Sequence, residues 1–466
     1  MWFTKMDANN PKKLLDLAVQ SLLSHESAAL QALEDIPRDL FIPLFIAAFD
    51  GGHKDILSEI VKVWPFYCLH IGPLIVQEPQ HELLKAMIEN FPVCPPKNSA
   101  SRTPKLRILD LRQDTDCRTT CPEISIKSPF CFYSCTYSDH SIAKIEEQIC
   151  FENSGSMIQS PRPVELLVDL SLDGSLMEKE FLILLMNKIK ESSGSLHICC
   201  RDLQVDKLCG CKCTLNFLDL KCVDQFSVDR GSLSDITSVL SRMAHLESLS
   251  LFKVTFRSLS GKVFKKFLGH LRRMESLKEL NLSSFYLKNN LDRVLRVLPP
   301  VLDFLYLPFC DLSYRDFRFL AQCPQASRLK LLNLSNNAMY WDDFEPFNAL
   351  LGNLSDTLQH LEINHCLIGD SAMSSLIPAL IRCTHLRVLG FASNPITMPV
   401  LANVMNSLTT LKKLKIVIYP IPVHCYERWH FQGSLDRRKL AIVQLQLKAM
   451  LQIAERNDMN WITYTE

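Results

Sequence analysis

The chain has 466 residues, of which 47% are hydrophobic and 22% charged, so it can bury an extensive core. Its 51 lysines and arginines almost balance its 50 aspartates and glutamates, leaving a net charge of +1. This balance disfavours a nucleic-acid-binding protein, because such proteins usually carry a basic stripe. There are only 14 glycines and neither GxxxxGK nor GxGxxG occurs, which argues against the phosphate-binding loops of nucleotide-dependent enzymes.

The N-terminal sequence MWFTKMDANNPKK lacks the apolar segment and the cleavage site of a secretory signal peptide. The longest apolar run, residues 40–49, has about half of the ~20 residues that a membrane-spanning helix needs. We therefore expect a cytoplasmic protein, with a nuclear share left open. The 18 cysteines should stay reduced in that compartment.

Residues 1–105 are predicted to form a helical domain. Leu14, Ala18 and Leu22 recur at intervals of four and so share one helix face. Ile36-Pro37 begins a further helical unit, and two later stretches have the apolar spacing of amphipathic helices, residues 53–64 and 80–91. From spacing alone, the face of Leu14, Ala18 and Leu22 could be a docking surface or part of a core that covers the end of the next domain.

Residues 106–162 are predicted to contain one strand and then a mobile insertion. Leu106, Leu109 and Leu111 have strand-like spacing, whereas residues 112–162 lack sustained periodicity and are rich in Ser, Thr, Asp and Cys. The cysteines there and in CGCKC (residues 209–213) lack the usual CxxC spacing of zinc modules, so no metal site is expected. No HExxH or GxSxG motif is present, so no enzyme is expected.

A leucine repeat runs through the second half of the chain. Leu277, Leu280 and Leu282 begin the pattern LxxLxLxxNxL, and the same frame starts at Leu215, Leu246, Leu277, Leu302, Leu329, Leu358, Leu386 and Leu411. These spacings are close to the period of leucine-rich repeats. The LxL core predicts a short strand whose alternate side chains point inward. We therefore predict an α/β fold, in which residues 163–432 form a leucine-rich-repeat solenoid of curved parallel strands with outer helices, preceded by the helical domain.

The other phase of each predicted strand should face the concave surface. There, Phe252, Phe304, Tyr306 and Leu331 are expected to form an exposed aromatic-aliphatic patch, a feature typical of protein-binding surfaces. His360 and Glu362 complete the set of candidate substrate-binding residues. The alternative is that convex loops cover these side chains. Residues 433–466 are predicted to contain a helix and tail that cover the last repeat.

Several blocks of this sequence resemble the PRAME family, which includes the oogenesins. They include PKKLLDLAVQSLL, ALEDIPRDLFIPLFIAAFDGGH, VKVWPFYCLHIGPL, KLRILDLRQ and, near the end, YPIPVHCYERWHFQGSLDRRKLAIVQLQLKAML. The resemblance extends from about residue 11 to residue 452. It implies a leucine-rich-repeat protein that serves as the substrate receptor of a cullin-2 ubiquitin ligase, with elongin B/C and cullin-2 as partners.

The same resemblance implies roles for two N-terminal segments. The elongin-binding box of the family corresponds to Leu14, Ala18 and Leu22, where a small residue between two leucines lets the backbone of a partner approach closely. The cullin box corresponds to four further residues, Ile36, Pro37, Leu40 and Leu44, and its proline fixes how the next helix enters.

Two functions follow, and neither requires a cofactor, a nucleic acid or a membrane. In the first, the chain is a substrate adaptor of a cullin-2–elongin B/C ligase that binds protein substrates on its concave face and promotes their proteasomal degradation. In the second, it is a non-ligase interaction scaffold or transcriptional co-regulator that affects proliferation, differentiation and apoptosis.

Overall fold

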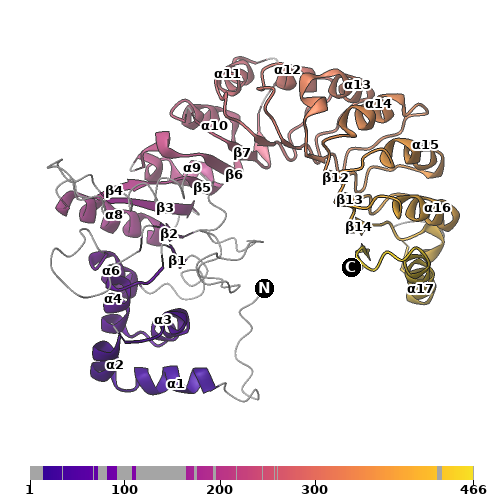
Figure 1. The fold of residues 1–466 in the computed structure, drawn as a ribbon. Helices are drawn as coiled ribbons and strands as arrows, with labels where there is room; N and C mark the ends of the chain where they lie inside the picture. Colours follow the sequence, from indigo (N-terminus) through magenta and orange to yellow (C-terminus); the bar gives the residue numbers. More distant parts are fainter. Residues whose placement is uncertain are drawn as a thin grey trace, which may run out of the picture. The chain divides into compact units, whose positions relative to one another are not determined.

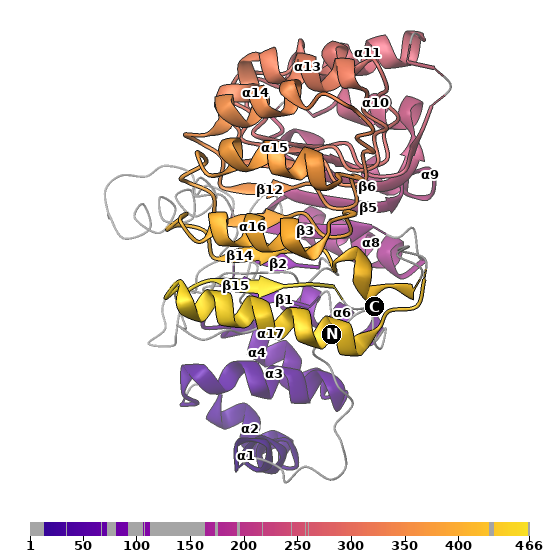
Figure 2. The same cartoon turned by 90° about the vertical axis from the view of Figure 1, so that its right-hand side faces the viewer.

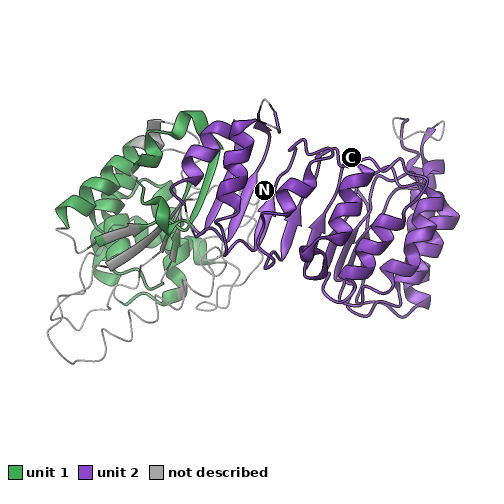
Figure 3. Cartoon of the chain, turned by 90° about the horizontal axis from the view of Figure 1, so that it is seen from above, with its two compact units in different colours: residues 1–223 green, residues 224–466 purple. Residues whose placement is uncertain are grey.

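The computed structural model describes residues 14–33, 35–66, 68–71, 81–91, 106, 108–111, 164–172, 176–192, 196–216, 218–243, 245–256, 258–259, 261–427 and 433–464. The chain divides into two compact units, residues 1–223 and residues 224–466 (Figure 3). Each unit is described by itself. The predicted insertion at residues 112–162 lies outside the described residues.

Unit 1 begins with short helices that pack around buried aromatic rings: α1 (Leu14–Leu23), α2 (Glu26–Ala32), the 3₁₀ turn η1 (Arg38–Leu40), α3 (Phe41–Asp50) and α4 (Lys54–Lys62). Helix α1 contacts α2 and α3, and α3 contacts α4 (Figure 1). The fully buried Trp64 ring meets Phe45 and Phe66 edge-on, at centroid distances of 5.5 and 5.6 Å. Such pairs add specific stabilisation to the burial of their area, so this cluster forms the centre of the helical region.

Parallel strands follow within unit 1: β1 (Cys68–His70), β2 (Ile108–Asp110), β3 (Val164–Leu172), β4 (Leu196–Cys199) and β5 (Asp202–Lys207). They pair in the order β1-β2-β3, and β3 then pairs with β4 through its first half and with β5 through its last residues. Helices α6 (His81–Glu89), α8 (Leu176–Glu191) and α9 (Leu208–Cys211) complete the unit with the turns η3 (Thr214–Asn216) and η4 (Leu220–Cys222). The region predicted as a helical domain, residues 1–105, thus also contains a strand, β1.

Unit 2 is built on one parallel sheet in the order β6-β7-β9-β10-β11-β12-β13-β14-β15. The strands are short, which matches the LxL core of each repeat: β6 (Gln225–Ser232), β7 (Ser248–Leu251), β8 (Val254–Thr255, paired with β6), β9 (Glu279–Asn281), β10 (Phe304–Tyr306), β11 (Leu331–Asn333), β12 (His360–Glu362), β13 (Val388–Gly390), β14 (Ile416–Ile418) and β15 (Asn460–Ile462). The middle leucine of successive strands is buried and lies directly beside its neighbour, as at Leu305, Leu332 and Leu361.

Helices cover the outer side of this sheet, as Figure 1 shows. They are α10 (Leu233–Leu240), α11 (Lys262–Leu271), α12 (Leu291–Leu295), α13 (Tyr314–Gln322), α14 (Glu345–Leu354), α15 (Asp370–Leu380), α16 (Met398–Leu408) and α17 (Arg437–Ile453), with the turns η5 (Pro324–Ser327) and η6 (Val423–Cys425). Figure 2 shows α17 and β15 at the C-terminal end of the array. Parallel strands that alternate with outer helices confirm the predicted leucine-rich-repeat fold.

Asn337 shows what a polar residue after the strand contributes to the repeat. Its side chain is fully buried. The amide Nδ2 donates hydrogen bonds of 2.8 Å to the carbonyl oxygens of Leu307 and Leu334, while Oδ1 accepts from the backbone N–H groups of Cys310 and Leu312 at 3.2 and 3.1 Å. These backbone groups are buried where the chain leaves the strand, and without the amide only Leu334 O would keep a partner, the Cys366 thiol. Asn337 therefore links two adjacent repeats.

From residue 310 to residue 394, the same position alternates between cysteine and asparagine. Asn394 repeats the bonding of Asn337. Cys310 and Cys366 instead donate weak hydrogen bonds from Sγ to a carbonyl oxygen of the preceding repeat, at 3.0 and 3.3 Å, and each thiol also lies within reach of a carbonyl oxygen of its own repeat. Burial raises the pKa of both thiols from the ordinary value of 9.0 to about 12. A buried thiol can stay neutral, so these cysteines are structural.

Two predicted repeat frames are wrong. The pairing of β6 with β7 aligns Phe226 with Leu249, so the first frame of unit 2 contains Val223, Phe226 and Val228, instead of Leu215, Leu218 and Leu220. At the other end, Val417 aligns with Leu389 and Ile416 with Val388. The last frame therefore contains Leu414, Val417 and Tyr419 instead of Leu411, Leu414 and Ile416, because burial of Val417 and Tyr419 turns Ile416 to the opposite face.

Candidate protein-binding surfaces

Helix α1 carries the first candidate surface. Val19 and Leu23 are buried against the neighbouring helices, whereas Leu14, Leu15 and Leu17 are 84%, 37% and 49% exposed. Of the other two residues predicted to bind elongin, Ala18 is exposed and Leu22 is half-buried. The predicted face of Leu14, Ala18 and Leu22 is therefore largely accessible in unit 1, with further exposed leucines beside it. Apolar side chains that remain in water on one helix face are typical of a docking surface.

The predicted cullin-binding residues are divided between the core and the surface. Ile36 and Leu44 are buried, at 5% and 1% exposure, whereas Pro37 is exposed and Leu40 half-buried. Pro37 stands before η1 with a φ of −54°, which its ring fixes, and it thereby sets the entry into α3. Only Pro37 and Leu40 of this set offer accessible surface, while Leu44 belongs to the core of α3.

The inner face of unit 2 carries two rows of side chains that run across the strands. We name the first the apolar row, since all of its members except one histidine are apolar. Strand pairing places these members side by side: Phe304, Leu331, His360, Val388 and Ile416. The second, which we name the polar row, contains Tyr306, Asn333 and Glu362. All the members of both rows are partly accessible, and neighbouring strands lie about 4.8 Å apart. The two rows form a continuous surface on which the apolar part adjoins the polar part.

A hydrogen-bonded chain joins the two rows. His360 Nε2 lies 2.7 Å from Glu362 Oε1, and Asn333 Nδ2 donates to Glu362 Oε2 at 2.8 Å. Glu362 is therefore held in one orientation by two neighbours on two strands. Side chains that are fixed in this way lose little conformational entropy on binding, which favours their use in recognition.

Phe252 lies outside these two rows. It follows β7, and the pairing of β7 with β9 places it beside Ser283, just after β9. The pairing of β9 with β10 in turn places Ser283 beside Pro308, two residues beyond Tyr306. The position of Phe252 is about 10 Å across the strands and about 7 Å along them from Tyr306. The predicted patch of Phe252, Phe304, Tyr306 and Leu331 is thus divided. Sequence reasoning also missed two members of the apolar row: Val388, although its frame was predicted correctly, and Ile416, which the wrong last frame assigned to the core.

A hollow of about 690 Å³ lies between the loops that follow β11 and β12. Tyr340 and Trp341 form part of its wall, and Asp342 and Glu345 contribute carboxylates. Tyr340 is 78% exposed, while Trp341 packs edge-on against Phe317 at 4.6 Å. No local sequence pattern indicates this hollow, because segments of two different repeats form it.

In the described part of the chain, no three side chains of His, Cys, Asp or Glu gather closely enough to hold a metal ion. In the CGCKC segment, Cys211 is buried while Cys209 and Cys213 are exposed. No described helix is long and apolar enough to cross a membrane.

Comparison with known proteins identifies the family. Residues 164–462 match the PRAME C-terminal domain, and residues 11–117 match the PRAME N-terminal domain. The chain belongs to the PRAME family. Human PRAME family member 8 is 30% identical to it over 443 residues, which cover 92% of this chain and 90% of the relative. Leucine-rich repeat-containing protein 14 of Bos taurus is 30% identical over 489 residues, 97% of each chain.

Among solved structures, the leucine-rich repeat-containing protein LegL7 of Legionella pneumophila is 15% identical, with a TM-score of 0.36. The match covers 63% of this chain and 91% of that protein.

Proposed function

We propose that this PRAME-family protein is a non-enzymatic substrate adaptor of a cullin-2–elongin B/C ubiquitin ligase. The observation that carries the proposal is the exposure of α1, in which Leu14 and Leu17 face water while Val19 and Leu23 bury the opposite face. A short helix that leaves several leucines in water gains stability by placing them against a partner. The small side chain of Ala18, exposed between Leu14 and Leu22, would let that partner approach the helix backbone.

On this proposal, Pro37 and Leu40 would contact cullin-2, because they are the accessible members of the segment that resembles a cullin box. Protein substrates would bind to the inner face of unit 2. The apolar row supplies area that can be removed from water, and the Asn333–Glu362–His360 chain supplies oriented polar groups. This combination of an apolar centre with polar neighbours is typical of protein interfaces.

The burial of Ile36 and Leu44 favours a second function, a protein-interaction scaffold or transcriptional co-regulator without a ligase. With those two side chains in the core, the segment at residues 36–44 offers cullin-2 less surface. The inner face of unit 2 would then bind partners for another purpose.

Affinity purification of the tagged full chain separates the two functions. We expect elongin B, elongin C and cullin-2 to copurify with the wild-type chain and with Tyr306→Ala. Leu14→Asp should lose all three, and Leu40→Asp should lose cullin-2 while it retains elongin. If the wild-type chain copurifies with other proteins but with neither elongin nor cullin-2, the scaffold function is correct.

A further inference from the structure

Helix α17 has apolar side chains on two opposite faces. The inner face buries Leu440, Val443 and Leu447, where α17 contacts α16 and η6. The opposite face carries what we name the outer stripe: Ile442, Leu445, Ala449 and Ile453. Their spacing of three, four and four residues places them on one side of the helix. Ile442, Leu445 and Ile453 are 57%, 67% and 84% exposed.

The outer stripe is unusual for the end of a repeat array. The last element of a soluble solenoid normally presents a polar outer face, because nothing stacks on it. A helix that is apolar on both sides is typical of a helix buried on both sides. The structure therefore leaves α17 with a surface suited to one more layer.

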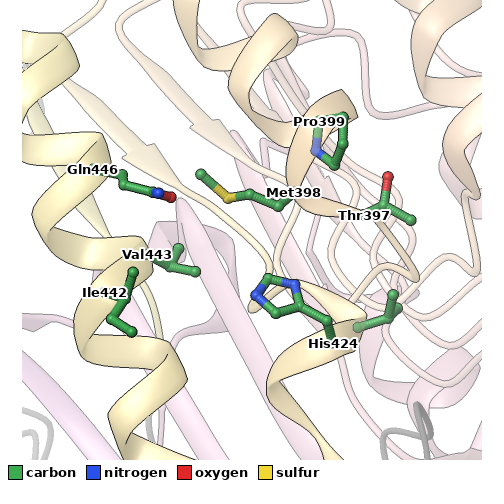
Figure 4. A pocket seen from close by; sticks show the side chains of 8 residues that line it. Thr397, Met398, Pro399, His424, Ile442, Val443 and Gln446 are labelled. Atoms are coloured by element: carbon green, nitrogen blue, oxygen red, sulfur yellow. The ribbon is translucent and has the colours of Figure 1, made fainter.

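A pocket of about 370 Å³ adjoins the stripe. Figure 4 shows Ile442, Val443 and Gln446 of α17 on one side of it, Met398 and Pro399 of α16 on the other, and His424 below. Because Ile442 belongs to both the pocket and the stripe, a segment that lies along the stripe could insert a large apolar side chain between α16 and α17. Pockets of this kind hold the anchor residues of bound helices.

The charges of α17 define the chemistry of the partner. Within residues 437–453 there are four basic side chains and no acidic one: Arg437, Arg438, Lys439 and Lys448. All four are exposed. Asp436, which precedes them, caps the helix by accepting hydrogen bonds from the backbone N–H groups of Arg438 and Lys439. The outer stripe is thus apolar with a basic border, in a chain whose net charge is only +1.

We propose that the outer stripe and its pocket dock an acidic amphipathic helix of another protein. The apolar face of that helix would cover the stripe, one large apolar side chain would enter the pocket, and its carboxylates would lie beside Arg438, Lys439 and Lys448. Complementary charge across an interface favours this partner. A symmetric pairing of two α17 helices would instead bring two basic borders together. The docking surface lies at residues 397–453 and does not depend on the adaptor function of α1.

The test uses the full chain and a fluorescein-labelled synthetic peptide of about five helical turns, with leucines at helical spacing on one face and glutamates elsewhere. We expect saturable binding by fluorescence anisotropy. Leu445→Glu should weaken this binding about ten-fold or more, because the new carboxylate would lie against the apolar face of the peptide and repel the peptide's own carboxylates. Ile381→Glu is the matched control: it introduces the same charge at an exposed isoleucine outside α17 and should leave the affinity unchanged. Both variants should keep the wild-type melting temperature.

Charge is tested separately. The same peptide with lysine in place of glutamate should bind about ten-fold more weakly or not at all, and Lys439→Glu/Lys448→Glu should reverse this preference. Equal binding of both peptides, or no binding of either, overturns the proposal. Two other outcomes would also overturn it. One is a concentration-dependent dimer that Leu445→Glu abolishes, and the other is Leu445-dependent binding to phosphatidylserine vesicles in a chain that ignores the acidic peptide.

Discussion

Substitutions on opposite faces of α1 test whether this helix is a docking element. Leu14 is 84% exposed, so its replacement removes only about 0.2–0.5 kcal/mol of the ~1.5–3 kcal/mol that a fully buried leucine contributes. Aspartate at the first residue of a helix gains a similar ~0.3–1 kcal/mol from the helix dipole. Leu14→Asp should therefore leave the stability of the chain nearly unchanged.

Leu23 lies in the last turn of the same helix and is only 8% exposed. Leu23→Asp should cost at least the ~2–5 kcal/mol of a buried leucine truncation, because it also buries a carboxylate. For a unit of this size, that loss lowers the melting temperature by about 4 °C or more. The same substitution on one helix thus separates a surface position from a core position.

Elongin B/C binding is then measured by isothermal titration calorimetry with the purified full chain. We expect Leu14→Asp to weaken binding at least ~10-fold at an unchanged melting temperature. If its affinity stays within about two-fold of wild type, α1 is not the elongin site. If Leu14→Asp lowers the melting temperature as much as Leu23→Asp, the outward face of α1 is part of a core.

Three further expectations concern unit 2. Leu305→Ala should lower the free energy of unfolding of this unit by about 2–5 kcal/mol in denaturant unfolding. Tyr306→Ala should lower it much less, but should deplete the proteins captured on the inner face. Equal losses of stability would contradict the observed strand phase. Asn337→Ala should cost about 3 kcal/mol or more, because three buried backbone groups lose their partner and Leu334 O keeps only the weak hydrogen bond from Cys366 Sγ, and a cost below about 1 kcal/mol would show that water replaces the amide. Iodoacetamide at pH 8 should label Cys209 in the native chain and spare Cys310, because burial holds the pKa of the Cys310 thiol near 12. The stability from the neutral thiol is present below pH 9.0 and is lost as pH rises from there toward 12. Rapid labelling of Cys310 at pH 8 would refute its burial.

The repeat core was predictable because the sequence encodes it with local spacing. Leu277, Leu280 and Leu282 all have 0% exposure, and the three-and-two spacing that revealed them is the same spacing that turns them toward the core. The prediction of the repeat frame was wrong where several alignments of the leucine pattern fit the sequence equally well. In LKKLKIVIYP, the leucine pattern favours Ile416 as a core residue, but the pairing of Val417 with Leu389 decides otherwise.

The surfaces were less predictable, because exposure depends on neighbours that lie far away in the sequence. Leu14 and Leu44 have the same spacing signals, yet one is 84% and the other 1% exposed, since α3 has further helices on its sides. Similarly, Phe252 belongs to the predicted strand phase, but the register between strands moves it away from Tyr306. A single sequence indicates which residues alternate and does not specify which strand lies beside which.

The two outward apolar helix faces in this chain differ in charge, and this difference would keep their partners apart. Helix α1 contains one acidic residue, Asp16, and no basic residue, whereas α17 contains four basic residues and no acidic one. Apolar area supplies binding free energy without strong selectivity, while like charges at the border of an interface exclude wrong partners. An acidic helix that fits α17 would therefore be disfavoured on α1, where its carboxylates would meet Asp16. On the two proposals made above, Asp16 of α1 and the basic border of α17 would therefore favour different partners.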